Sequence, residues 1–198
     1  MKKILIADDE PEIVDIVKRM LKGRYEVIEA YDGEECIKKA KKEKPDLILL
    51  DILMPKIDGW DVLRKLKEND ETKDIPVSML TALPLTPEDT KDKPIDRIEN
   101  YILKPFTKET LIRKIEDIFE REREAKEIYE KLKKKAGKKI AEEYLKLVKA
   151  INRHRRLIGV ILNYPEKEVV RNLIVSQKRL IEVMKKRMEE LEELLKKE

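Results

Sequence analysis

Three aspartates follow short apolar runs in the first quarter of the chain. Asp8 and Asp9 come directly after residues 3–7, and Asp51 ends the most apolar run, residues 46–50. At the carboxyl ends of parallel strands such side chains meet in one crevice. Three crowded carboxylates repel one another unless a divalent cation neutralises them. Oxygen ligands at an open site suit Mg²⁺ together with a phosphate, so the sequence predicts a magnesium site.

Two further polar residues end apolar runs later in the chain. Thr81 follows the fourth run, and Lys104 follows the fifth and precedes Pro105. A hydroxyl donor and an ammonium group can contact the oxygens of a phosphoryl group beside a metal ion. Together with the aspartates, they indicate phosphoryl transfer to a carboxylate nucleophile.

The elements that position these residues alternate between strand and helix patterns. Apolar runs predict strands, and apolar residues at helical spacing predict the helices between them. Alternation of this kind is typical of an α/β fold with a five-stranded parallel sheet, doubly wound. The predicted strands are 3–7, 25–30, 46–50, 76–80 and 101–103, and the predicted helices are 10–21, 33–42, 60–67 and one that begins after Thr107.

A fourth helix should lie between Thr81 and Asn100, but the sequence specifies it poorly. Pro87 suits a first helical turn after Thr86. Pro94 is incompatible with a regular helix interior. We therefore expect a short or broken helix in this stretch.

Five motifs together resemble the response-regulator receiver family, as in chemotaxis regulators. The resemblance covers about 120 residues, and its motifs occur in the family's order and spacing. They are residues 4–10 (Ile-Leu-Ile-Ala-Asp-Asp-Glu), 49–55 (Leu-Leu-Asp-Ile-Leu-Met-Pro), 58–59 (Asp-Gly), 80–82 (Leu-Thr-Ala) and 101–106 (Tyr-Ile-Leu-Lys-Pro-Phe). The resemblance implies a flavodoxin-like receiver domain over residues 1–121 that signals in a two-component system.

The resemblance also implies roles for the acidic residues. Asp51 is expected to accept a phosphoryl group from a cognate histidine kinase. Asp9, Asp51 and the backbone carbonyl of Leu53 are expected to bind Mg²⁺ directly, and Asp8 is expected to act through water. The only catalysis expected is the chain's own phosphorylation and dephosphorylation, so the chain is not predicted to be an enzyme acting on other substrates.

Three other residues gain expected roles in the same way. Lys104 should contact the phosphoryl oxygens. Thr81 should move towards the phosphate, and Tyr101 should move inward behind it. Such a switch is a shift between two conformations driven by a new local charge.

The sequence departs from the family pattern at three places. Leu53 and Leu83 stand two residues beyond the phosphoacceptor and beyond the switch threonine. In the family these positions flank the path of the attacking water, and apolar side chains cannot orient it by hydrogen bonds. We therefore predict slow autodephosphorylation. Residues 97–100 (Arg-Ile-Glu-Asn) replace the usual Gly-Ala-Asp before the switch aromatic, which puts the family's common dimerisation face in doubt.

Residues 122–198 carry helical patterns without strand patterns. Apolar residues recur at spacings of four and three, which indicates a coiled-coil seam. We expect one long helix from 107 to 161, a turn at 163–165 and a return helix over 166–197. A two-helix hairpin buries little surface alone, so we predict a homodimer through these helices or packing on the receiver.

Two other outputs remain open for this region. Residues 131–156 hold eleven Lys or Arg against two Glu, a density that could contact a nucleic-acid backbone, although a solvated Lys-rich face is favoured. His154, the only histidine, could transfer phosphate in a phosphorelay, but its place on the seam favours a core role. An aspartyl phosphatase is disfavoured because such enzymes usually carry Asp-x-Asp on the first strand.

Composition sets broader limits. Residues 1–105 carry 20 Lys and Arg against 24 Asp and Glu, whereas residues 106–198 carry 26 against 18, so the two parts should meet different partners. A single cysteine, Cys36, permits no intrachain disulfide. No apolar run is long enough to span a membrane, and we expect a cytoplasmic protein. The excess of Lys and Glu resembles proteins from hot environments.

Overall fold

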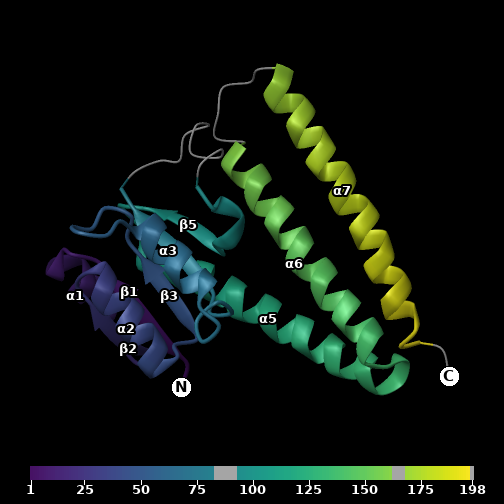
Figure 1. Cartoon of the computed structure of the whole chain (residues 1–198), viewed down its shortest axis with the longest axis horizontal. Coiled ribbons are helices and arrows are strands. Elements are labelled where there is room, and N and C mark those ends of the chain that lie inside the picture. Colours follow the sequence, from purple (N-terminus) through teal and green to yellow (C-terminus); the bar gives the residue numbers. More distant parts are fainter. Residues whose placement is uncertain (83–92, 162–167, 197–198) are drawn as a thin grey trace. The chain divides into compact units, whose positions relative to one another are not determined.

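The structure is a computed structural model that describes residues 1–82, 93–161 and 168–196 (Figure 1). The chain divides into two compact units, Met1–Lys114 and Ile115–Glu198. The boundary predicted at residues 121 and 122 stays a prediction, because one continuous helix, Lys108–Ala136, supplies residues to both units.

The first unit contains the predicted five-stranded parallel sheet. Its order is β2-β1-β3-β4-β5, so the order reverses beside β1. In open α/β sheets this switch point opens a crevice at the carboxyl ends of the strands. The strands are β1 (Lys3–Ala7), β2 (Glu26–Ala30), β3 (Leu47–Leu50), β4 (Val77–Thr81) and β5 (Asn100–Leu103).

Burial along the strands explains the sheet's register. All four residues of β3 are buried, as predicted for a central strand covered on both faces. Ala7 pairs with Leu50 across β1 and β3, which brings Asp8 and Asp51 to the same edge. Thr81 pairs with Leu103, which brings Lys104 to that edge as well.

Helices connect the strands and flank the sheet. α2 and α3 begin after Asp32 and Asp58, whose side chains accept backbone N–H hydrogen bonds from Glu35 and Asp61. Such caps satisfy amide groups that the first helical turn leaves without partners. Within the described residues, the α-helices between strands are α1 (Pro11–Leu21), α2 (Gly33–Glu43) and α3 (Gly59–Glu68).

The poorly specified fourth helix falls mostly on residues 83–92, which lie outside the described residues. In the described part that follows, Pro94 precedes a single 3₁₀ turn, Ile95–Arg97. A regular helix ending next to β5 is absent from residues 93–99, in keeping with the constraint that Pro94 places on the backbone.

The C-terminal part is helical throughout its described residues, as predicted, but its first helix is not continuous. α5 spans Lys108–Ala136, α6 spans Lys138–Ile161 and α7 spans Glu168–Glu193. The prediction of one helix from 107 to 161 is therefore wrong. Gly137 has φ +91° and separates α5 from α6, because a left-handed glycine ends a helix. The predicted turn at 163–165 lies outside the described residues.

α6 and α7 run side by side within the second unit (Figure 1). Ile151 of α6 and Ile181 of α7 occur at the spacings of four and three that define the predicted seam, and both are buried. Near Gly137, a small core joins all three helices through Leu132, Ala141, Tyr144 and Leu191. On the same seam, a ring nitrogen of His154 is hydrogen-bonded to the side-chain oxygen of Gln177.

Candidate functional site

An acidic cluster lies at the switch point of the sheet. Carboxylate oxygens of Asp8, Asp9 and Asp51 lie within 4.8 Å of one another. Asp8 and Asp51 are buried, whereas Asp9 is exposed to solvent. The structure therefore brings together the three aspartates that the sequence assigned to one crevice, with one side open to solvent.

Lys104 joins this cluster from the end of β5. Its Nζ lies 2.7 Å from Oδ2 of Asp8 and 3.3 Å from Oδ1 of Asp51. Glu10 adds a third carboxylate at 3.6 Å from the same nitrogen. Because the Lys104 side chain is only 12% exposed, its charge acts at short range with little screening by water.

Burial and charge shift the ionisation of the buried groups. Burial raises the pKa of Asp51, and the Asp8 charge adds to this shift while Lys104 opposes it. Burial also raises the pKa of Asp8 above its ordinary value, against the hydrogen bond from Lys104. For Lys104, burial alone lowers the pKa, but the two aspartates outweigh burial and the net shift is upward. The site therefore favours a bound cation when both aspartates are ionised.

The backbone around Asp51 holds its carboxylate in place. The N–H of Leu53 donates to Oδ2 of Asp51 at 2.9 Å. Gly59 packs so closely that an added Cβ would lie 2.1 Å from the Asp51 carbonyl oxygen, and its N–H donates to the Ile52 carbonyl. The loop after β3 can therefore fold back on the strand only with glycine at this position. The sequence had singled out the Asp58–Gly59 pair but not this reason for it.

The remaining predicted site residues take the following places. Thr81 is fully buried at the end of β4, and its carbonyl accepts a hydrogen bond from the Lys104 N–H at 2.8 Å. Tyr101 is half-buried within β5, next to Met79 in the register. The Leu53 side chain is 54% exposed beside the acidic cluster. Leu83 lies outside the described residues.

Among the described residues, Glu10 is a charged contact of Lys104 that sequence reasoning missed. It stands two residues after Asp8, in the last position before α1, and its N–H donates to Oδ1 of Asp8 at 3.1 Å. The Asp-Asp-Glu stretch was visible in the sequence, but nothing there indicated that the third acidic side chain would also reach Lys104.

Residues 4–116 match the family model of the response regulator receiver domain, which covers more than half of the chain. This chain belongs to that family. The fold and the acidic crevice described above are those expected of a receiver.

Three similar proteins illustrate the likeness. The chain is 38% identical over 128 residues to the alkaline phosphatase synthesis transcriptional regulatory protein PhoP of Bacillus subtilis, a match that covers 61% of this chain and 49% of PhoP. It is 47% identical to the N-terminal domain of a response regulator receiver protein from Methanoculleus marisnigri, with a TM-score of 0.50 over 60% of this chain and 96% of that one. The chain thus spans about half the length of the curated relatives it matches.

A third similar structure contains a metal ion. The receiver domain of the sensor histidine kinase PA1611 from Pseudomonas aeruginosa is 27% identical, with a TM-score of 0.51 over 57% of this chain and 92% of that one. It has a magnesium ion coordinated in its active site cleft. The oxygen-only cluster of Asp8, Asp9 and Asp51 fits the same kind of ion, since Mg²⁺ prefers carboxylate and carbonyl ligands.

No helix in the described part of the chain is both long enough and apolar enough to cross a membrane.

Proposed function

We propose that this response regulator accepts a phosphoryl group on Asp51 from a histidine kinase, with Mg²⁺ bound directly by Asp9, Asp51 and the backbone carbonyl of Leu53, and by Asp8 through water. The observation that carries the proposal is the placement of a buried Asp51 carboxylate 3.3 Å from the Lys104 ammonium and beside two further aspartates. A nucleophile, a cation and a metal-binding cluster at one edge are the parts that phosphoryl transfer needs.

In the proposed reaction, an oxygen of Asp51 attacks phosphorus and the bond from phosphorus to the donor's imidazole nitrogen breaks. The departing nitrogen keeps the bonding electron pair and takes a proton from the solvent. Lys104 is placed to stabilise the negative charge on the transferred oxygens. When bound, Mg²⁺ supplies additional positive charge to those oxygens. Asp8 and the Leu53 N–H orient the lysine and the nucleophile, respectively. The chain's own catalysis is proposed to be limited to this transfer and to hydrolysis of the product.

The proposed response to phosphorylation begins with Thr81 and Tyr101. Thr81 stands at the same sheet edge as Asp51, and Tyr101 lies on the neighbouring strand. A phosphoryl group brings oxygens that accept a hydrogen bond from a hydroxyl, so the threonine side chain would reorient and leave room for the tyrosine.

For the output, we propose that the C-terminal helices join two copies of the chain. Among the described side chains of α7, four large apolar ones outside its seam positions are exposed: Leu173, Val175, Leu180 and Val183. Leu173, Leu180 and Val183 recur at spacings of seven and three, as on a helix face that packs against another helix. Phosphorylation would then act on helices in a pair of chains.

A nucleic-acid output has its own supporting observation. Around Gly137, the end of α5 and the start of α6 expose six lysines: Lys131, Lys133, Lys134, Lys135, Lys138 and Lys139. The relative PhoP is named a transcriptional regulatory protein. Binding through these lysines would weaken steeply with salt, so mobility shifts at low and high salt with bulk DNA and RNA would test this alternative.

The phosphorylation proposal is tested with a small phosphodonor. Incubation of the full chain with acetyl phosphate and Mg²⁺ should add one phosphoryl group per chain, detected by intact mass. The Asp51→Asn variant and a sample with chelated Mg²⁺ should remain unmodified. The phosphoryl group should be lost in alkali, as an acyl phosphate is. Phosphorylation of the Asp51→Asn variant to the same extent as the wild type would overturn the proposal. Sedimentation of the two forms then tests dimerisation separately.

A further inference from the structure

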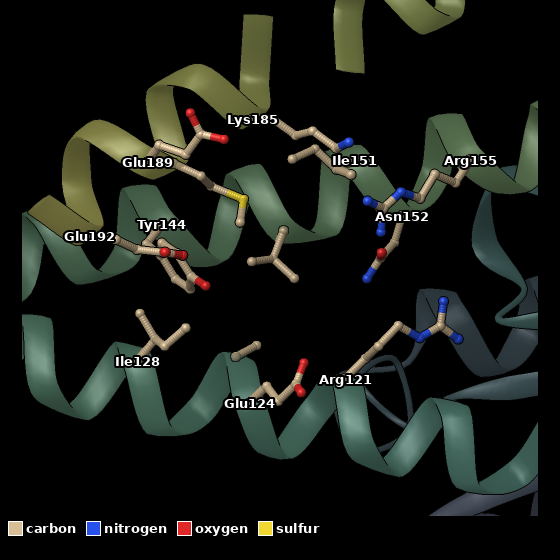
Figure 2. A pocket seen from close by; sticks show the side chains of 13 residues that line it. Arg121, Glu124, Ile128, Tyr144, Ile151, Asn152, Arg155, Lys185, Glu189 and Glu192 are labelled. Atoms are coloured by element: carbon tan, nitrogen blue, oxygen red, sulfur yellow. The ribbon is translucent and has the colours of Figure 1, made fainter. Parts of the chain in front are cut away.

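A groove of about 410 Å³ lies in the C-terminal unit, between α5, α6 and α7 (Figure 2). Its volume is within the range of small-molecule sites. All of its lining residues belong to the second unit, so it is separate from the acidic cluster at Asp51.

Three cationic side chains, one from each helix, line the groove. They are Arg121 of α5, Arg155 of α6 and Lys185 of α7, and Figure 2 shows Arg121 and Arg155 on the same side of it as the Asn152 amide. Within the described part of the chain, none of the three forms an ion pair. Arg121 uses Nε to donate to the carbonyl of Asp117, which leaves its other nitrogens available. Cations from three separate helices that line one groove without an ion-pair partner suit a bound anion.

The opposite side of the groove carries acidic groups. Figure 2 shows Glu189, Glu192 and Tyr144 there. Burial raises the pKa of Tyr144 above its ordinary value, and electrostatic and hydrogen-bond contact with Glu192 adds to this shift. With Glu124, the groove has three acidic and three basic lining residues. Glu124 stands one helical turn from Arg121 on α5, so acidic and basic groups both line the groove, and this balanced charge disfavours a polyanion such as nucleic acid.

The centre of the groove is apolar. Its surface comes from Ala125, Ile128, Val148, Ile151 and Met188. Burying apolar ligand surface there would stabilise the complex through the hydrophobic effect. A small inorganic anion would leave this apolar surface exposed to water, and a neutral hydrocarbon would leave the three cations without a partner.

We propose that this groove binds a small amphipathic carboxylate. The carboxylate group lies among Arg121, Arg155 and Lys185, and the hydrocarbon body lies over the apolar centre. Such a ligand would contact all three helices, including α5, which also supplies residues to the receiver unit. Ligand binding at this site would therefore give the same chain a second signal besides phosphorylation.

Octanoate is a suitable probe for the full-length, unphosphorylated chain. Titration calorimetry should show saturable binding of one octanoate per chain. Acetate, which lacks the hydrocarbon body, and 1-octanol, which lacks the charge, should each bind at least about tenfold more weakly. Acetate loses the apolar burial, and 1-octanol loses the charge-assisted hydrogen bonds to the cations.

Two pairs of matched variants locate the site. Lys185→Gln and Arg121→Gln should each weaken octanoate binding about tenfold. Their neighbours Lys186→Gln and Arg123→Gln remove the same charge outside the groove lining and should change affinity less than twofold. Ala125→Leu fills the groove from a half-buried position and should abolish binding without loss of the folded state, as judged by circular dichroism.

Several outcomes overturn the proposal. One is the absence of saturable octanoate binding, and another is equal affinity for octanoate and 1-octanol. A third is an equal loss of octanoate affinity in the variants of lining residues and in the variants of their neighbours. If Lys185→Gln and Ala125→Leu change the sedimentation mass but not octanoate affinity, the groove is an interface between copies instead. Because none of these measurements needs phosphorylation, failure here is distinguishable from failure at Asp51.

Discussion

Nζ of Lys104 lies 2.7 Å from Oδ2 of Asp8, although the two residues are 96 positions apart in the sequence. Asp8 follows β1 and Lys104 follows β5, and these strands are separated in the sheet by β3 and β4. The ion pair therefore crosses the top of the crevice and passes Asp51, which lies at the end of β3. Its formation places a positive charge beside the nucleophile before any phosphoryl group arrives.

Loss of this lysine should destabilise the metal-free chain. Lys104→Met leaves the buried Asp8 and Asp51 carboxylates without their cation, and breaking a buried pair in this way costs about 3–5 kcal/mol. Added Mg²⁺ should restore most of the loss, because it supplies the missing positive charge. Urea denaturation with chelator and with saturating Mg²⁺ measures both effects. Lys56→Met, which removes an exposed partner of Asp32, is the control and should cost less than about 1 kcal/mol. An equal loss for Lys104→Met with and without Mg²⁺ would contradict this account.

Removal of the nucleophile should instead stabilise the metal-free chain. The pKa of Asp51 is raised in the folded state, so its ionised form costs free energy on folding at neutral pH. Asp51→Asn removes that cost while Lys104 keeps its closer partner, Asp8. We expect a gain of about 1 kcal/mol without metal, roughly 2–4 °C in Tm for a chain of this size. Saturating Mg²⁺ should reverse the order, because the wild type binds the ion more tightly. Asp61→Asn, an exposed carboxylate paired with Arg64, should not show this reversal in thermal melts.

The sheet and the acidic crevice could be predicted because each depended on local patterns. Four-residue apolar runs such as Leu47–Leu50 specify a central strand, and parallel strands deliver the residues at their ends to one edge. The contact between Glu10 and Lys104 could not be predicted, since it depends on the direction of one side chain. The convergence of Arg121, Arg155 and Lys185 depends on how three helices pack, which the heptad pattern of any single helix does not specify.

The pH below which the phosphorylation rate falls should depend on the Mg²⁺ concentration. The reaction needs the ionised Asp51, and burial raises its pKa above the ordinary value of 3.8. At low Mg²⁺ the rate should therefore fall at a higher pH than for an ordinary carboxyl group. A bound cation favours the ionised form and should shift this limit to lower pH. Initial rates with acetyl phosphate, measured against pH at limiting and saturating Mg²⁺, test the shift. A limit at the same pH under both conditions would show that Asp51 ionisation does not control the rate.

The phosphorylated chain should lose its phosphoryl group slowly. The Leu53 side chain is 54% exposed next to Asp51, and it offers a water molecule no hydrogen bond. Leu53→Asn introduces a polar side chain beside the attacking path, and a positioned polar group accelerates proton-linked steps by about 10²–10⁴-fold at best. We expect the variant to shorten the phosphoryl half-life by at least about tenfold. The measurement is the loss of intact mass over time after removal of the phosphodonor. A half-life in the wild type no longer than in Leu53→Asn sinks the prediction.

Replacing two glycines of the C-terminal unit by alanine should change the free energy of unfolding in opposite directions. Gly137 has φ +91°, and an added Cβ would meet nothing within 4 Å, so the cost of alanine there comes from the left-handed backbone alone, about 1 kcal/mol. Gly159 lies within α6, and its added Cβ also meets nothing within 4 Å. Alanine at 159 should stabilise the helix by about 1 kcal/mol. Urea denaturation of the full chain, followed by helical circular dichroism, compares the pair. If Gly137→Ala were instead stabilising, the two helices would join into the continuous helix that the sequence pattern predicted, and the break between α5 and α6 would not be intrinsic to the chain.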